Sequence, residues 1–395
     1  MKYFRTIFLI MFLCNIANFA YCFNLSGYIE NLFSYNKSKN TLVNPENILS
    51  ISKFANLTEL QLNLSSKDKK TLIIDTRARY DTETEDFSTH FDQAYINFDA
   101  SEITKFKMGR QRIGFGVGYL WNPVNNLDLQ KDIYNPTKYI EGIDGLKFNL
   151  DFTSKIGKPM NLNFEILPPI NYSDNSSISY SKFGSQFYIF TNEIEIGLVS
   201  SYHKTPLNSE NILFGSYYSI DIKGIIFGLE YAQSKNNDII YFTDTGIKNK
   251  STYYPQIVLN MNKRTSEKSF LVLEYFYNGS GYDKNEFENL LNLTKNNYSV
   301  YGHTTLSVLN PGYVNRNYIF STFSNEISDY VSLSISSMLN IDNSGAFIYP
   351  QISWTKIKNL TLSLENISNI SANKDSEFSI IPYYYILIIR SQYYF

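Results

Sequence analysis

Apolar and polar side chains alternate along many short stretches of this chain, and this alternation limits its fold more than any other feature. In Gly145–Phe152, one face would carry Leu146, Phe148, Leu150 and Phe152, and the other would carry Gly145, Lys147, Asn149 and Asp151. The segments Thr71–Tyr80, Met160–Leu167 and Glu193–His203 alternate in the same way. A period of two predicts β-strands with one apolar and one polar face. A charged face is intolerable inside a soluble sandwich, but it is expected against a water-filled lumen, with the apolar face toward lipid.

The composition agrees with this interpretation. Of the 395 residues, 16% are aromatic and 18% are charged, and this charged fraction lies below the roughly 25% of soluble domains. Beyond the N-terminus, the longest apolar run is Tyr383–Ile389, which is far shorter than the ~20 residues of a membrane-spanning helix. The net charge of −2 offers no basic surface for nucleic acid, and the many aromatic and β-branched residues exclude disorder. We therefore expect an all-β fold, a transmembrane antiparallel β-barrel.

The first residues have the pattern of a secretory signal peptide. Lys2 and Arg5 precede the apolar run Ile7–Leu13, and Ala20 stands at position −3 of a cleavage site after Cys22. We expect residues 1–22 to be removed and residues 23–395 to form a single barrel domain.

Cleavage would also remove both cysteines of the chain, Cys14 and Cys22. The mature chain would then have no disulfide and no cysteine metal site. Its net charge would change from −2 to −4, because Lys2 and Arg5 are lost. In the alternative interpretation, a lipoprotein, Cys22 would be acylated, but Tyr21 is too large for the position before such a cysteine.

Nineteen segments have the alternation of strands. They lie near 24–35, 54–65, 71–80, 90–99, 103–112, 142–153, 159–168, 182–190, 193–203, 211–221, 224–234, 253–262, 268–277, 297–308, 316–325, 330–340, 346–355, 358–367 and 381–395. Single-chain bacterial barrels have even strand numbers, because both ends lie in the periplasm. Short periplasmic turns should alternate with long external loops, such as 113–141 and 235–252. Counting the connections forward from the first strand and backward from the last strand gives the same alternation only if 297–308 lies within one external loop, 278–315. The sequence thus predicts eighteen strands, with sixteen as the alternative.

A short helix is expected within this external loop. In Gly279–Leu293, the residues Glu286, Phe287, Leu290 and Leu291 recur at helical spacing. No Pro-rich linker, internal repeat or charge block divides the chain, which agrees with one domain.

The last expected strand, 381–395, ends in an aromatic residue. Tyr393 and Phe395 share one face with Ile389 and Leu387, and this strand must close the barrel so that no edge remains open. The ending resembles the signal by which outer-membrane proteins are delivered to the barrel-assembly machinery. We therefore expect Tyr393 and Phe395 to be an assembly signal. The expected location is the outer membrane of a Gram-negative bacterium, with outer-membrane lipid and the barrel-assembly machinery as partners.

The most distinctive segment is Gly109–Gly145. It contains Gly-Arg-Gln-Arg at 109–112, Gly-Phe-Gly-Val-Gly at 114–118 and Trp121-Asn122-Pro123, followed by Asp128, Asp132, Glu141 and Asp144. It resembles a segment of uncharacterised bacterial outer-membrane porin-like barrels, in which a strand ending in Gly-Arg-Gln runs into a Gly-rich turn and a Trp-Asn-Pro loop. Glu274–Tyr282 and Asn340–Pro350 resemble that group as well. The resemblance spans most of the mature chain and implies the barrel, but it does not indicate the solute.

A connection of nearly thirty residues after the fifth strand is long for a barrel. Gly114, Gly116 and Gly118 permit a sharp fold-back, so the loop could enter the lumen and narrow it. The alternative is a surface loop over the barrel mouth. In general porins such an inward loop supplies acids that face a basic wall. The expected residues of this constriction loop are Trp121, Asn122, Pro123, Asp128, Asp132 and Glu141.

The charged faces of the strands are expected to line the pore. Arg77, Arg79, Lys105 and Lys107 would form a basic patch, whereas acids outnumber bases elsewhere, which predicts weak selectivity that leans to cations. Arg110 and Arg112 are expected near the external rim, because a lipid-facing arginine at the midplane costs roughly 2–4 kcal/mol. The expected pore-lining residues are Arg77, Arg79, Lys105, Lys107, Lys147, Asp151, Glu165, Glu193, Glu195 and Glu230.

These features predict a porin-like channel for passive diffusion of small hydrophilic solutes or ions, with no cofactor and no metal. One alternative is a plugged barrel whose external loops act in adhesion or assembly. Another is a barrel hydrolase, but His90, His203 and His303 are scattered and define no catalytic group. The sequence leaves the choice between a monomer and an oligomer such as a trimer open.

Overall fold

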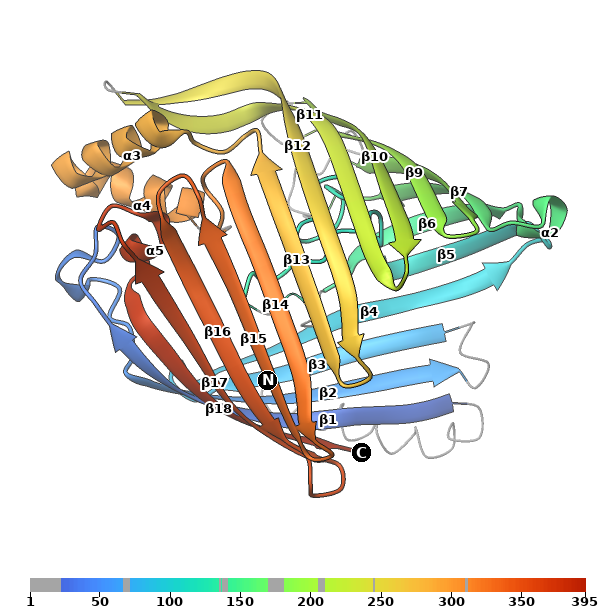
Figure 1. The fold of residues 1–395 in the computed structure, drawn as a ribbon, viewed down its shortest axis with the longest axis horizontal. Helices are drawn as coiled ribbons and strands as arrows, with labels where there is room; N and C mark the ends of the chain where they lie inside the picture. Colours follow the sequence, from blue (N-terminus) through green and yellow to red (C-terminus); the bar gives the residue numbers. More distant parts are fainter. Residues whose placement is uncertain are drawn as a thin grey trace, which may run out of the picture.

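A computed structural model of the chain describes residues 23–66, 72–134, 136, 141–169, 181–204, 210–243, 246–309 and 312–395. The predicted signal peptide, residues 1–22, lies outside the described residues. The strands form one 18-stranded antiparallel sheet. The sheet closes because β1 (Phe23–Ser38) pairs with both β2 (Phe54–Ser66) and β18 (Tyr383–Tyr394), as Figure 1 shows. The prediction of an eighteen-stranded barrel is confirmed.

Every other strand pairs with its neighbours in the sequence. Their bounds are β3 (Leu72–Asp81), β4 (Asp86–Asp99), β5 (Thr104–Gln111), β6 (Ile143–Asp151), β7 (Met160–Leu167), β8 (Lys182–Thr191), β9 (Ile194–Lys204), β10 (Glu210–Ile222), β11 (Ile225–Thr243), β12 (Gly246–Ser266), β13 (Ser269–Asn278), β14 (Asn317–Ser328), β15 (Val331–Asn340), β16 (Gly345–Trp354) and β17 (Leu360–Ser371).

The outer face of the barrel is apolar, as the alternation predicts. Four phenylalanines form an aromatic ladder on this face across β4 to β7: Phe98, Phe106, Phe148 and Phe164. The centroids of successive rings in the ladder are 5.0, 5.1 and 6.1 Å apart. Such cross-strand ring pairs stabilise a sheet by roughly 0.2–1 kcal/mol each.

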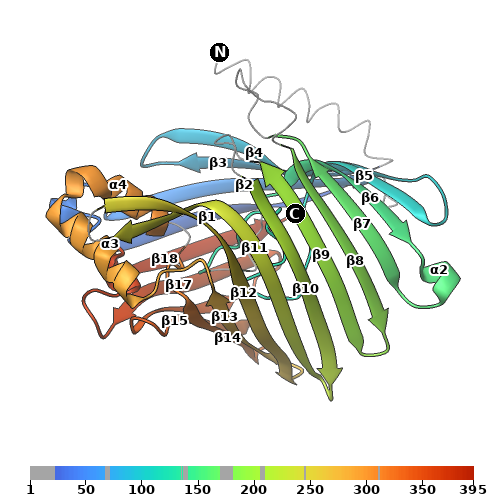
Figure 2. The same ribbon diagram turned by 90° about the horizontal axis from the view of Figure 1, so that it is seen from above.

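The strands β11 and β12 correct one prediction. The external loop expected at 235–252 is wrong, because both strands continue through this range as a long hairpin that projects beyond the neighbouring strands toward α3 (Figure 2). The pairing register shifts between Asn236 and Ile239, and the ladder continues beyond this point. A bulge thus lies within the range where a loop was expected.

Helices lie over the barrel end that carries the longer connections (Figures 1 and 2). The expected loop helix is confirmed as α3 (Lys284–Asn296), which begins with a capping box between Asp283 and Glu286. Residues 297–308, which the strand count excluded from the barrel, form most of α4 (Tyr298–Leu309). Short helices are η1 (Pro45–Asn47) and α5 (Glu377–Ile380) at this end and α2 (Thr153–Ile156) at the opposite end. Within the described residues, no helix has both the length and the apolar character needed to cross a membrane.

The last residue of the chain helps to close the barrel. Phe395 donates its backbone N–H to the carbonyl oxygen of Gly27 at 3.0 Å and accepts the N–H of Gly27 at 3.2 Å. The side chains of Phe395 and Tyr393 remain exposed on the outer face. The closing pair therefore ends in an aromatic residue at the barrel rim, where aromatic girdles lie in transmembrane barrels.

We predict that Phe395→Ser lowers the fraction of chain that inserts into the outer membrane, while export to the periplasm continues. The substitution removes the aromatic contact at the closing pair, which forms last between the two ends of the chain. The measurement is the heat-modifiable band on gels of outer-membrane fractions. Phe190→Ser is the matched control, because Phe190 is an exposed aromatic residue at the same end of the barrel, on β8. Equal insertion of both variants would contradict the prediction.

Candidate functional site

The described part of the connection between β5 and β6, residues 112–134, folds back inside the barrel. Its first part packs Phe115, Val124 and Leu127 against inner-wall residues such as Val199 of β9 and Leu213 of β10. Farther along the same wall, Leu120, Trp121 and Ile133 contact a cluster that includes Val258, Phe276, Phe320 and Phe347. The geometry therefore favours the inward loop over the surface cap.

Two glycines are needed for this fold-back. Gly116 has a φ of +87°, in the left-handed region that favours glycine. A Cβ atom there would overlap the carboxylate of Glu230, and a Cβ atom at Gly118 would overlap the carbonyl oxygen of Trp121. A larger residue at Gly116 would push the loop away from the wall, and one at Gly118 would distort the turn within the loop.

Two fully buried glutamates on the wall capture five consecutive backbone N–H groups of the loop. Glu230 of β11 accepts the N–H groups of Val117 and Gly118 at 2.5 and 2.7 Å. Glu274 of β13 accepts the next three, from residues 119–121, at 2.6, 3.0 and 2.8 Å. Carboxylates removed from water require such donors, and a loop without secondary structure requires acceptors. The loop thus supplies hydrogen-bond donors to the two carboxylates, and the carboxylates supply acceptors to the loop.

This arrangement corrects one expected site residue and adds another. Glu230 was expected to line the pore, but it lies beneath the loop with no exposed surface. Glu274, equally buried, was not among the expected site residues. It shares its face of the predicted strand 268–277 with Phe270, Val272 and Phe276, and a lone carboxylate among apolar residues was the available signal.

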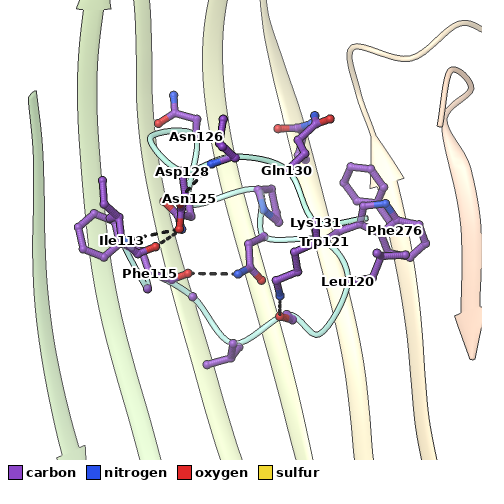
Figure 3. Close-up of a pocket in the computed structure, with 18 of the residues that line it drawn as sticks. Ile113, Phe115, Leu120, Trp121, Asn125, Asn126, Asp128, Gln130, Lys131 and Phe276 are labelled. Atoms are coloured by element: carbon purple, nitrogen blue, oxygen red, sulfur yellow. Dashed lines mark hydrogen bonds between the residues drawn. The ribbon is translucent and has the colours of Figure 1, made fainter. Parts of the chain in front are cut away.

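Side chains of the loop add further bonds, some of which Figure 3 shows. Lys131 donates to the carbonyl oxygens of Gly118 and Tyr119 at 2.9 and 2.5 Å, and burial lowers the pKa of this lysine. Asp128 accepts the N–H of Ile113 at 3.2 Å, and burial raises the pKa of its carboxyl group. Asp128, expected to face a basic wall, instead fastens the loop to itself.

The Trp-Asn-Pro motif is part of the packed loop. The Trp121 ring stacks on Phe276 with centroids 5.0 Å apart, Asn122 donates to the carbonyl oxygen of Phe115 at 3.4 Å, and Pro123 is buried. These three residues therefore hold the loop in shape, and Phe276 is a partner that the sequence motif did not identify.

Three cavities lie on and around the loop. The external cavity, of about 750 Å³, is bounded by external segments and by residues 129–134 of the loop. A cavity of about 600 Å³ lies within the loop (Figure 3). A third, of about 560 Å³, lies toward the periplasmic strand ends, next to Pro159 and Glu195. The middle cavity shares Lys131 with the external cavity and Gly116 with the periplasmic cavity.

Two of the four residues of the expected basic patch, Arg77 and Lys105, are held in ion pairs. Arg77 lies between Glu59 and Asp92, at 3.6 and 2.7 Å. Lys105 pairs with Asp151 at 2.9 Å, and Lys147 pairs with Glu165 at 3.2 Å. The Nζ atom of Lys107 lies 3.8 Å from the ring centroid of Tyr95, a cation–π geometry. Arg79 is exposed near the external end of β3.

A second paired arginine, which was not among the expected residues, lies on the same wall. Arg390 of β18 is held between Glu30 of β1 at 2.8 Å and Glu365 of β17 at 2.7 Å. Glu30 stands directly opposite Glu59 of β2 in the strand register. The wall thus carries two arginines, each between two carboxylates, with Glu59 and Glu30 adjacent in the middle, so carboxylates outnumber guanidinium groups.

The remaining expected residues fall in different places. Glu193 lies in the exposed turn between β8 and β9, so its expected position on the pore wall is wrong. Glu195 does line the periplasmic cavity. Asp132 and Glu141 line the external cavity together with Arg77.

The two arginines expected near the external rim lie on either side of the end of β5. At the external end of β5, Arg110 pairs with Glu141 and Asp144, each at 3.0 Å. Arg112 lines the cavity within the loop.

A closed antiparallel barrel with an inward loop defines the fold class of the outer-membrane porins. Pseudomonas aeruginosa OccK3 (OpdO) is similar over 94% of this chain and 95% of that chain, with a TM-score of 0.55 and 9% identity. P. aeruginosa OccK2 (OpdF), solved in complex with glucuronate, covers 94% and 97%, with a TM-score of 0.54 and 9% identity. Salmonella typhi OmpF, solved in complex with daunomycin, covers 94% and 97%, with a TM-score of 0.50 and 10% identity. No family model and no curated protein matches the sequence. At these identities the likeness establishes the shared fold.

We predict that Glu274→Gln loosens the loop. An amide places an NH₂ group against N–H donors and removes the charge, and charge-assisted bonds contribute roughly 1.5–3 kcal/mol each. Hydrogen exchange at the amides of residues 119–121 should accelerate by about a hundredfold, with the barrel strands unchanged. Glu326→Gln, on the neighbouring strand β14, is the control because Glu326 is exposed. Unchanged exchange in the Glu274 variant would contradict the assigned role.

A separate buried carboxyl group fastens the external segment before β18. Glu377 of α5 accepts the N–H of Val314 at 3.1 Å, the hydroxyl of Tyr318 at 2.6 Å and the amide of Asn340 at 2.6 Å. Burial raises the pKa of Glu377 from 4.5 to about 7. The docked segment therefore binds a proton more tightly than the released segment does.

This raised pKa predicts a pH dependence with a definite sign. Between pH 4.5 and 7 the folded state holds the extra proton, so the stability contributed by Glu377 falls as the pH rises through this window. The thermal unfolding midpoint of the wild type, relative to Glu377→Gln, should decline from pH 5 to pH 8. Parallel pH profiles for the two proteins would contradict the prediction.

Proposed function

We propose that this chain is an outer-membrane channel for passive diffusion of small hydrophilic solutes and ions. The observation that carries the proposal is the inward loop, which is fastened inside the barrel with one cavity on its external side and another on its periplasmic side. The cavity within the loop shares lining residues with both. A barrel arranged in this way supports a path for solutes that narrows at the loop.

The likeness to porin structures supports the same class of cargo. OccK2 and OmpF, which share the fold, were each solved with a small organic molecule, glucuronate and daunomycin. The apolar outer face suits outer-membrane lipid, and the exposed Tyr393 and Phe395 suit recognition by the barrel-assembly machinery. Residues 1–22 are proposed to be the export signal.

The wall charges support a preference for cations. The loop packs on β7 to β16, which leaves β17, β18 and β1 to β4 as the free wall. The inward charges of that wall include Glu30, Glu59, Asp75, Asp92 and Glu365 on the acidic side and Arg77, Arg79 and Arg390 on the basic side. Since Arg77 and Arg390 are each shared by two carboxylates, the positive patch expected at Arg77 contributes little attraction for anions.

The test is conductance of the purified full chain in planar bilayers. We expect stepwise ion currents with a reversal potential that leans to cations, and a larger single-channel conductance after deletion of residues 119–138. The described residues of the deleted segment, 119–134 and 136, belong to no strand, so the barrel should remain heat-modifiable.

Two outcomes would contradict the proposal. Folded wild-type barrels that carry no current would favour the plugged barrel with an external adhesion role. An unchanged conductance in the deletion variant would show that the loop does not narrow the path.

A further inference from the structure

The external cavity has an apolar side that a channel for water and ions does not require. Val43 and Leu49 come from the connection before β2, Leu306 and Leu309 come from α4, and Ile381 and Pro382 precede β18. Loop residues including Leu129 complete this side. Leu49 is 42% exposed and Leu129 is 48% exposed. Apolar surface gathered from four separate segments and left facing water is unfavourable unless something covers it.

The same cavity also has a charged side, formed by residues of both signs. Arg77 and Glu141 are already held in ion pairs with Asp92 and Arg110, which leaves Lys131 and Asp132 to face a solute. One charge of each sign provides a partner for a carboxylate and for an ammonium group alike, so the cavity favours neither a net cation nor a net anion. The cavity volume of about 750 Å³ lies within the range of roughly 300–1,000 Å³ found for small-molecule sites.

We propose that this cavity binds small zwitterionic solutes that carry an aliphatic or aromatic group, which are amino acids with apolar side chains and short peptides of them. The apolar group covers the leucines, while the ammonium and carboxylate groups face the charged side. The inference rests on the proposed channel function and names a solute class for it. A solute held here lies directly above the loop, in contact with Lys131, which also lines the next cavity.

The test compares two zwitterions that differ only in apolar surface, leucine and glycine. Each is added to the external side of the wild-type channel in a planar bilayer, and the concentration that halves the ion current is measured. Partial burial of the leucine side chain should make its half-blocking concentration about fivefold lower than that of glycine. Isopentylamine and 4-methylpentanoate, which each carry one charge, should block less well than leucine.

Variants identify the cavity as the place of binding. The double variant Leu49→Ser/Leu306→Ser should bring the half-blocking concentration of leucine to within about twofold of that of glycine. Ile48→Ser is the matched control and should behave as the wild type, because Ile48 is 59% exposed and does not line the cavity.

Equal block by leucine and glycine, or an unchanged leucine effect in the double variant, would overturn the inference while the channel function stands. Equal block by either singly charged analogue would overturn the zwitterion assignment. A failure of the channel function itself would be recognised separately, as the absence of any current.

Discussion

The structure depends on one exchange of hydrogen bonds, between two wall carboxylates and five consecutive backbone N–H groups. Residues 117–121 of the loop have no helix or strand to satisfy their donors, and Glu230 and Glu274 have no water to solvate their charge. With the loop in place and water excluded, the buried donors and the buried carboxylates each require the other. The position of the loop, the three cavities around it and the free wall opposite all follow from this docking.

The charged side chains of the wall are also stabilised by partners from neighbouring strands. Arg77 and Arg390 are each shared by two carboxylates from neighbouring strands. Breaking such a partly buried pair by removing one partner typically costs about 3–5 kcal/mol, so these groups stabilise the polar wall as well as set its sign. Carboxylates remain in excess after pairing. Because Arg77 is paired with two of them, this wall is negatively charged where the sequence predicted a basic patch.

The fold could be predicted from local patterns because each barrel strand is recognised from the alternation of a few consecutive residues. The alternation of period two located the strands, and the parity of connections correctly removed 297–308, which is largely helical. The error at 235–252 arose because the pairing of the two strands continues past a bulge between Asn236 and Ile239, beyond the segments whose alternation was counted. The candidate site was harder to predict from the sequence. The fold-back at Gly116 could be anticipated from the glycines, whereas the pairing of Glu230 and Glu274 with the loop joins residues more than 110 positions apart in the sequence, and no local pattern encodes it.

The same docking argues that the loop is a fixed element of the channel. Lys131 holds the carbonyl oxygens of Gly118 and Tyr119, while Glu230 and Glu274 hold the N–H groups of these same two residues. Lys131 belongs to the loop and keeps this segment in shape, and moving the loop off the wall would break the charge-assisted bonds to Glu230 and Glu274, each contributing roughly 1.5–3 kcal/mol. A hinge motion of that cost is rare on the timescale of solute passage. Discrimination between solutes must therefore come from the walls of the cavities, so the apolar and charged sides of the external cavity carry more of the selectivity than any movement of the loop.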